Sequence, residues 1–369
     1  DRIDGDRGDY LEYLIQTQSR PELVYVGAND GMLHAIFTGT DTAASPAFTG
    51  GSEAFAFIPS AVIPNLPKLA GQSFKGGGHR YYVDGSPIVR DVFIGGEWRT
   101  VLVGTLRAGG KSVFALDITD PGIDGSGVKL LWEISNQDSD YEDLGFTFAR
   151  PEIARLHSGQ WGVLLGNGYD SNNGAAAMYV IDIADGSLLR KLEVDDGTDG
   201  SNGLSSVRGA DNNSDGVVDY AYAGDLKGNV WRFDLVPTGS SSAPDPFARS
   251  AVGTVDPSVF KVAYGGQPMF TADYNGLPQA ITAIPSLVRH PTRRGYLVIV
   301  GTGKYFETAD SAPDTSKANS IYAIWDRYSR GENTTSALAS ASRSNMEQRN
   351  ITTESVQTFN RQTGGSVTS

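Results

Sequence analysis

Val163-Leu164-Leu165-Gly166, an apolar run that ends in glycine, is followed by Met178-Tyr179-Val180-Ile181-Asp182, an apolar run that ends in aspartate. The segment Arg150–Arg155 precedes the pair, and a short turn separates it from the first run. All three have the length and the β-branched and aromatic content of strands. Together they predict a unit of three consecutive antiparallel strands.

The same unit recurs along the chain, and its copies can be laid over one another. Other copies of the first strand are Ser86–Arg90, Ser205–Arg208 and Ile284–Arg289. Other copies of the second strand are Val24–Gly27, Val101–Gly104, Tyr222–Gly224 and Val298–Gly301. Other copies of the third strand are Met32–Ile36, Val113–Asp117, Val230–Asp234 and Ile321–Asp326. A fourth strand often follows, at Leu130–Ile134 and Leu188–Val194.

A period of roughly 50 to 75 residues built from consecutive strands is typical of propeller blades. We therefore predict an all-β protein, a β-propeller with about five recognisable blades. Three blades are complete, whereas the first lacks its inner strand and the last its outer strand. Either an outer strand from one end closes the ring or further blades lie beyond this sequence. A pair of β-sandwiches is the alternative architecture.

The segment Asp211–Asp219 has the residue spacing of a calcium-binding loop. Oxygen-bearing side chains stand at positions one, three and five, a glycine stands at six, and an aspartate closes the set. The predicted ligands are Asp211, Asn213, Asp215, the backbone carbonyl of Val217, and Asp219. This set can supply six or seven oxygens, which suits calcium better than magnesium. The loop is not an EF-hand, because position twelve is Tyr222 and the flanks are predicted strands.

In the repeat, this loop replaces the hairpin between the first and second strands of one blade. It should therefore lie on the rim of one propeller face, away from a central pocket. A bracing or regulatory ion fits that place better than a catalytic ion, although both remain open. An acidic hairpin that binds nothing is the plain structural alternative.

Composition narrows the function classes. The 369 residues include no cysteine, so disulfides and thiolate metal sites are unavailable. The net charge of −13 argues against a nucleic-acid partner or an anionic membrane surface. No apolar run reaches transmembrane length, and the sequence begins at Asp1 without a methionine or signal peptide. We expect a piece of a longer, exported protein.

The segments Val24–Ala35, Gly104–Lys111 and Asp211–Asp234 resemble the PilY/PilC family of type IV pilus tip and biogenesis proteins, and the resemblance extends to about Asp326. It implies a C-terminal, quinoprotein-like propeller, with as many as seven blades in the whole domain. It also implies that Ca2+ on the loop controls pilus extension and retraction, and hence twitching motility and adhesion. All five of the family's loop ligand positions are matched. Implied partners are pilus components such as minor pilins. The implied location is the pilus tip, the cell surface or the outer membrane of a Gram-negative bacterium.

The tripeptide Arg7-Gly8-Asp9 is a second candidate site, because family members carry such a tripeptide before the propeller and it is linked to host integrin binding. An exposed Asp9 could complete a metal site on an integrin while Arg7 pairs with an acid. The alternative is structural, with Asp9 as the N-cap of a helix over Tyr10–Thr17. The predicted division is an N-terminal segment at 1–20, the propeller at 21–329, and a polar loop or extension at 330–369.

Signals for an enzyme are weak. Each histidine is predicted to be a surface or hairpin residue, because none has a partner at metal-ligand spacing. The histidines are His34, His79, His157 and His290. A quinone-dependent dehydrogenase on the same architecture is the enzymatic alternative, and a purely structural calcium-stiffened module is the third. We predict that the chain is not an enzyme.

Overall fold

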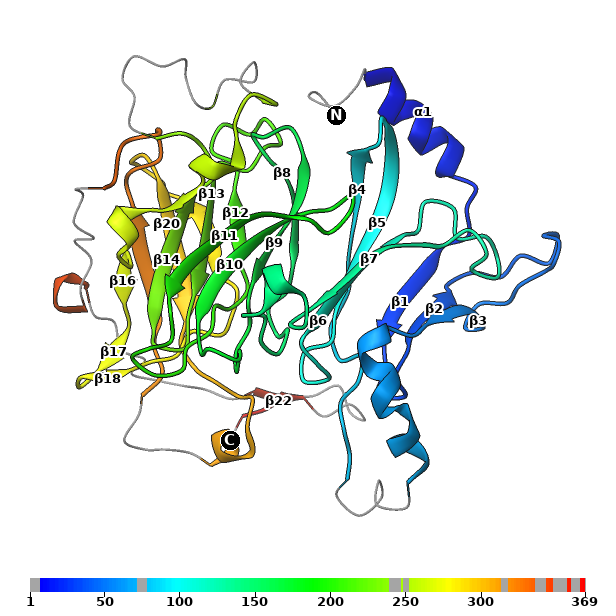
Figure 1. Ribbon diagram of the computed structural model, residues 1–369, viewed down its shortest axis with the longest axis horizontal. Coiled ribbons are helices and arrows are strands. Elements are labelled where there is room, and N and C mark those ends of the chain that lie inside the picture. The colour runs from blue at the N-terminus through cyan, green and yellow to red at the C-terminus, as the bar shows by residue number, and fades with distance from the viewer. Residues whose placement is uncertain are drawn as a thin grey trace.

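The structure is a computed structural model that describes residues 7–71, 78–238, 247, 252–312, 318–335, 343–347, 357–359 and 366–368. Five antiparallel sheets of three to five strands follow one another along the described chain. They lie side by side from β1–β3 to β19–β21 (Figure 1). The succession of blades confirms the predicted all-β propeller and rules out a pair of sandwiches.

Each blade keeps its strands in chain order. The first contains β1 (Leu23–Gly27), β2 (Leu33–Phe37) and β3 (Glu53–Phe57). The second contains β4 (Ile88–Ile94), β5 (Glu97–Thr105), β6 (Ser112–Asp117) and β7 (Lys129–Ser135). The third contains β8 (Glu152–Arg155), β9 (Trp161–Gly166), β10 (Ala176–Asp182) and β11 (Leu188–Asp195). The first blade thus has three strands, as predicted.

The last two blades differ in their outer strands. The fourth contains β12 (Arg208–Ala210), β13 (Tyr220–Gly224), β14 (Asn229–Asp234), β15 (Lys261–Val262) and β16 (Phe270–Thr271). Its outer strand is split, since β15 and β16 both pair with β14. The fifth contains β19 (Ser286–Arg289), β20 (Tyr296–Gly301) and β21 (Ile321–Asp326), so its three strands are also as predicted.

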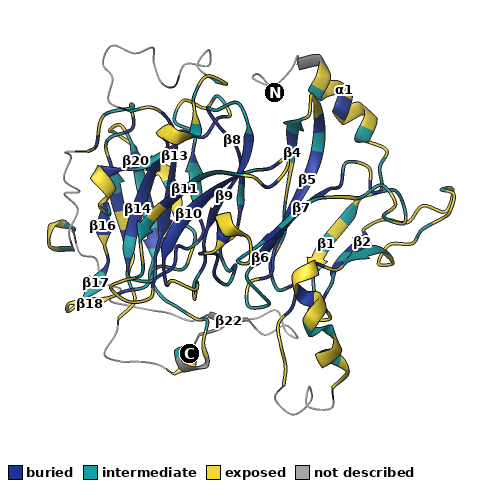
Figure 2. Cartoon of the chain, viewed as in Figure 1, coloured by how far each residue is buried: buried dark blue, intermediate teal, exposed yellow. Residues whose placement is uncertain are grey.

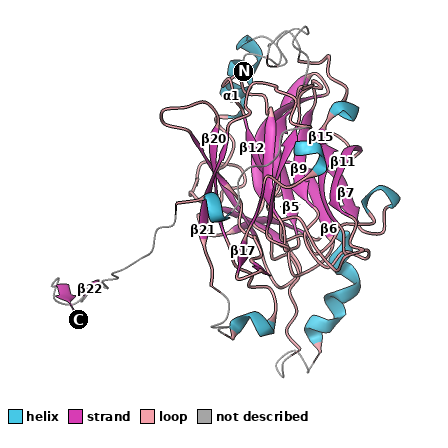
Figure 3. Cartoon of the chain, turned by 90° about the vertical axis from the view of Figure 1, so that its left-hand side faces the viewer, coloured by secondary structure: helices cyan, strands magenta, loops and turns pink. Residues whose placement is uncertain are grey.

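Helices and short hairpins surround the blades. The longer helices are α1 (Arg7–Thr17) and the 3₁₀ helix η1 (Ser60–Ala70), which follows β3. Short 3₁₀ turns are η3 (Ser139–Tyr141), η5 (Pro257–Val259), η6 (Tyr264–Gly266), η7 (Thr308–Ser311) and η8 (Arg343–Asn345). Two further hairpins are formed by β17 (Asp273–Tyr274) with β18 (Leu277–Pro278) and β22 (Gln357–Phe359) with β23 (Ser366–Thr368). Figure 3 shows the helices at the margins of the stacked strands.

The core consists of the interfaces between successive blades. Alternate residues of one strand serve opposite interfaces: Val163 and Leu165 of β9 pack with the second blade, and Leu164 packs with the fourth. Every residue of β9 is buried, whereas exposed and half-buried residues alternate along β1. A middle blade is covered on both faces, and for that reason its central strands β9 and β10 are almost entirely apolar. Figure 2 shows this contrast between the central strands and the margins.

Candidate calcium-binding loop

The segment 211–219 connects β12 to β13 at the end of an ordered ladder. Arg208 pairs with Tyr222 and Ala210 with Tyr220, so the two flanks are antiparallel strands as predicted. The first of them is shorter than expected, because Leu204 forms only an isolated bridge with Asp225. The loop is therefore an enlarged hairpin of the fourth blade.

Asp211 organises the first half of the loop through backbone amides. Its Oδ1 accepts hydrogen bonds from the amides of Ser214 (2.6 Å) and Asp215 (3.2 Å), and its Oδ2 accepts one from Gly216 (2.8 Å). Gly216 has a φ of 95°, a backbone conformation that glycine adopts far more readily than other residues. The glycine at position six thus has the role that the spacing predicts.

The middle of the loop repeats this pattern. The amide of Asp215 donates to Asn213 Oδ1 (3.2 Å), and the amide of Val217 donates to Asp215 Oδ1 (2.9 Å). Asn213 also donates through Nδ2 to Asp215 Oδ2 (3.0 Å) and to the carbonyl of Phe247 (2.8 Å). These bonds tie the side chains of Asn213 and Asp215 to the backbone around them.

Asp219 closes the loop in full burial. Its Oδ1 lies 2.7 Å from His157 Nε2, and its Oδ2 accepts the amide of Asn212 at 2.6 Å. Burial raises the pKa of the Asp219 carboxyl above its ordinary value, although the hydrogen bond to His157 and the Asn212 amide oppose the shift. His157 lies in the β8–β9 hairpin and is also fully buried. The predicted hairpin position is therefore confirmed, whereas a surface position is excluded, because His157 is buried against Asp219. The spacing of the sequence does not indicate this contact, since the two residues are far apart in sequence and only the fold joins them.

Cationic and hydroxyl groups of the fifth blade bind the loop backbone. Arg289 donates through Nη2 to the carbonyls of Asp211 (3.2 Å) and Asn212 (2.6 Å), and the Tyr296 hydroxyl donates to the Asp211 carbonyl (3.0 Å). In the described part of the chain, no lysine or arginine forms an ion pair with the carboxylates of Asp211 or Asp215.

The donor set fits calcium in its chemistry. All predicted ligand atoms are oxygens of carboxylates, an amide and a backbone carbonyl, which calcium prefers. The structure gathers the five residues in one loop but directs the carboxylates toward backbone amides. Among the described residues, no group of three histidine, cysteine, aspartate or glutamate side chains converges as a metal shell would. Small side-chain rotations within the loop would be needed to bring the oxygens to one point.

The Arg-Gly-Asp tripeptide forms the start of α1, which begins at Arg7 and places the exposed Asp9 in its first turn. The helix thus begins three residues before the predicted start at Tyr10, and Asp9 lies within its first turn rather than at the predicted N-cap. An acidic residue in the first turn stabilises a helix by its interaction with the helix dipole. The side chains of Arg7 and Gly8 lie outside the described part of the structure.

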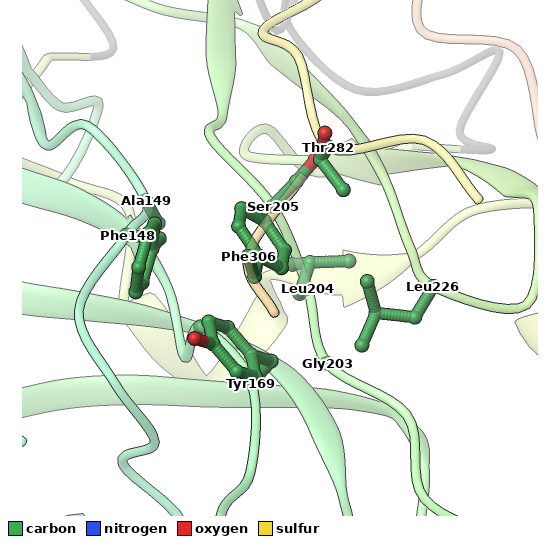
Figure 4. Close-up of a pocket in the computed structure, with 10 residues that line it drawn as sticks. Phe148, Ala149, Tyr169, Gly203, Leu204, Ser205, Leu226, Thr282 and Phe306 are labelled. Carbon is green, nitrogen blue, oxygen red and sulfur yellow. The ribbon is translucent and has the colours of Figure 1, made fainter. Parts of the chain in front are cut away.

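A small apolar cavity of about 20 Å³ lies at the other end of β12 and β13. The rings of Phe148, Tyr169 and Phe306 line it, with Leu204 and Leu226 beside them (Figure 4). Leu204 precedes β12 and Leu226 follows β13, whereas the loop 211–219 connects the opposite ends of these strands. A volume of this size holds about one water molecule.

Comparison with known proteins identifies the family. The family model described as the PilY1 beta-propeller domain matches residues 3–363. This chain belongs to the PilY1 propeller family. The crystal structure of the Pseudomonas aeruginosa PilY1 C-terminal domain is 53% identical, with a TM-score of 0.75 over 89% of this chain and 62% of that chain.

The curated relatives are named type IV pilus biogenesis factors. PilY1 of Pseudomonas aeruginosa is 52% identical over 95% of this chain, and a PilY1 homolog of Xylella fastidiosa is 36% identical over 84%. This chain spans 29% and 20% of their lengths. These names indicate no catalytic function. No helix in the described residues has the length and apolar character needed to cross a membrane.

Proposed function

We propose that this chain is the calcium-binding propeller of a type IV pilus biogenesis factor, and that the ion on the loop 211–219 regulates pilus extension and retraction. The observation that carries the proposal is a loop with three carboxylates, of which Asp211 and Asp215 have no lysine or arginine partner among the described residues. Carboxylates that are close together repel one another unless a cation binds between them. Family membership supplies the pilus context.

The proposal includes the setting in which the loop acts. Pilus components such as minor pilins are the proposed partners, and the pilus tip, the cell surface or the outer membrane of a Gram-negative bacterium is the proposed location. Twitching motility and surface adhesion are the proposed outputs. Each of these proposals concerns a whole pilus biogenesis factor. This chain matches only 29% of the length of its Pseudomonas aeruginosa relative.

The test replaces the buried ligand Asp219 by alanine and by asparagine. We expect both variants to lose calcium binding in titration calorimetry, while the melting temperature without calcium changes modestly. Asp185→Ala is the matched control, because the Asp185 carboxylate accepts a turn amide (Ser187, 2.9 Å) in the neighbouring blade. Calcium affinity of the wild-type value in Asp219→Ala would refute the ligand assignment. The same substitution in the full protein should change piliation or twitching.

Integrin binding through Arg7-Gly8-Asp9 stays a separate prediction. A helical first turn favours the structural role of Asp9. A solid-phase binding assay with purified integrin and the variant Asp9→Ala would decide, since adhesion by the tripeptide requires the variant to lose binding.

A further inference from the structure

The second half of the loop is attached to the third blade. Val217 forms a parallel bridge with Arg155 of β8, and the amide of Val218 donates to the Arg155 carbonyl at 2.9 Å. Next to this bridge, His157 Nε2 contacts Asp219 Oδ1 at 2.7 Å, and both side chains are fully buried. A predicted calcium ligand is therefore held by a side chain from a different blade.

The first half of the loop is attached to the fifth blade instead. Arg289 and Tyr296 bind the backbone carbonyl of Asp211, with distances of 3.2 and 3.0 Å. On the same side of the loop, Asn212 donates through Nδ2 to the carbonyl of Ser329 at 2.6 Å. The contacts on this side reach backbone atoms that are not among the predicted ligands. The contact from His157 reaches a ligand side chain.

We propose that His157 is a positioning residue for the calcium site, which orients the Asp219 carboxylate and so couples ion binding to the contact between the third and fourth blades. The proposal rests on the proposed calcium function. A carboxylate oxygen has more than one lone pair, so Asp219 can accept from His157 and still bind an ion. Because His157 is packed on all sides, its Nε2 fixes the rotation of the carboxylate.

A direct ligand role for His157 does not fit. Its Nε2 is used by Asp219, and calcium takes oxygen ligands rather than imidazole nitrogens. Hydrogen-bond partners of metal-binding carboxylates act on the metal through that carboxylate. Their removal lowers metal affinity by about 10-fold to 100-fold. This range sets the expected effect for His157.

The test compares His157→Phe with His157→Gln. Phenylalanine fills the buried space without a donor, whereas the glutamine amide can still donate to Asp219. In calcium titration calorimetry of the purified chain, we expect His157→Phe to bind about 10-fold to 100-fold more weakly. His157→Gln should recover most of the affinity. Tyr296→Phe is the matched control, because it removes one hydrogen bond to a loop carbonyl that is not a ligand, and its affinity should stay at the wild-type value.

Hydrogen exchange gives a second readout that also serves if His157→Phe fails to fold. In the wild type, calcium should slow exchange at the amides of Ser214 and Gly216 and also in the β8–β9 hairpin around His157. In His157→Phe at saturating calcium, the ion should still slow hydrogen exchange at the loop amides. It should no longer slow exchange in the β8–β9 hairpin. Wild-type affinity in His157→Phe, or no calcium effect on the wild-type hairpin, would overturn the positioning role. The proposed calcium function has its own contradicting results: the wild type does not bind calcium, or Asp219→Ala binds calcium as the wild type does.

Discussion

Two groups of aspartates in this propeller differ in the partners that their carboxylates have. Between the fourth and fifth blades, Arg232 pairs with Asp234 and Asp326 at 2.8 Å each, and all three side chains are buried. In the loop 211–219, the carboxylates of Asp211 and Asp215 receive only backbone amides and the Asn213 amide group. The first group carries its own cation. For the second, the described residues supply no lysine or arginine partner, and the cation that we propose is calcium.

The two groups also differ in how their cation responds to pH and to calcium concentration. Burial lowers the pKa of Arg232, but Asp326 and Asp234 raise it, and the net direction is well above its ordinary value. Tyr222 and Tyr264 add hydrogen bonds to Asp326 at 2.7 and 3.0 Å. The guanidinium of Arg232 therefore keeps its positive charge. The cation that we propose for the loop is calcium, whose occupancy would vary with its concentration, so the loop is suited to regulation while the arginine group is suited to holding blades together.

The largest expected effect comes from removing the internal cation. Arg232→Met leaves two buried carboxylates unpaired and should cost about 3–5 kcal/mol of unfolding free energy. Urea denaturation checks this, and calcium should not restore the loss. Arg294→Met is the matched control, since Arg294 pairs with Glu332 at 3.0 Å with both side chains partly exposed and should cost about 1 kcal/mol or less. Equal losses in both variants would contradict the contrast between buried and exposed pairs.

The next effect comes from the cation of the loop. A ligand that binds only the folded state, at a concentration 100 times its Kd, stabilises it by about 2.7 kcal/mol. Saturating calcium should therefore raise the melting temperature of the wild type relative to a sample with a chelator. Asp219→Asn should melt at the same temperature in both. If calcium does not change the melting temperature of the wild type, the loop contributes to stability independently of calcium, as the arginine group does.

The sequence predicts this loop far better than it predicts the arginine group. The loop ligands lie within one short segment, so their spacing alone predicts the calcium site that we propose. Arg232 lies within the third strand of the fourth blade, and Asp326 ends the third strand of the fifth. The repeat predicts both strands but not the pairing between them. His157 and Asp219 show the same limit, because a contact between hairpins of neighbouring blades depends on how the blades pack. The split outer strand β15 and β16 was also missed, since two-residue strands leave no periodic signal.

The turn within the loop offers a smaller test. A Cβ on Gly216 would meet no atom within 4 Å, so alanine there changes only the backbone preference. Holding alanine at a φ of 95° costs about 1 kcal/mol, which corresponds to about fivefold in calcium affinity. Gly276→Ala is the control, because Gly276 has a φ of 78° and the same open space in the β17–β18 turn. Titration calorimetry should show weaker calcium binding for Gly216→Ala and wild-type binding for Gly276→Ala. Wild-type binding in Gly216→Ala would mean that calcium binding does not depend on the backbone conformation at Gly216.

A third arrangement, in the first blade, lies between the two groups. His34 on β2 contacts Asp30 through Nε2 at 2.9 Å and Glu53 of β3 through Nδ1. Because the carboxylates bind opposite ring nitrogens, both bonds are complete only when the imidazole is protonated. The hydrogen bond to Glu53 raises the pKa of His34 above its ordinary value of 6.5; burial opposes the shift and Asp30 adds to it. Here the cation belongs to the protein but can be titrated.

The smallest expected effect follows from that titration. A histidine whose pKa is raised by folding contributes its full stabilisation below its unfolded pKa and loses it as pH rises through the folded pKa. Wild type should therefore exceed His34→Gln in stability at pH 5.5, by a few tenths of a kcal/mol because both carboxylates are substantially exposed. The difference should vanish at pH 8.5, as measured by urea denaturation at both pH values. A difference in stability that is the same at both pH values would mean that His34 acts by packing and not by its charge. Arg232 and the proposed calcium ion would then be the two cations that balance aspartates in this propeller.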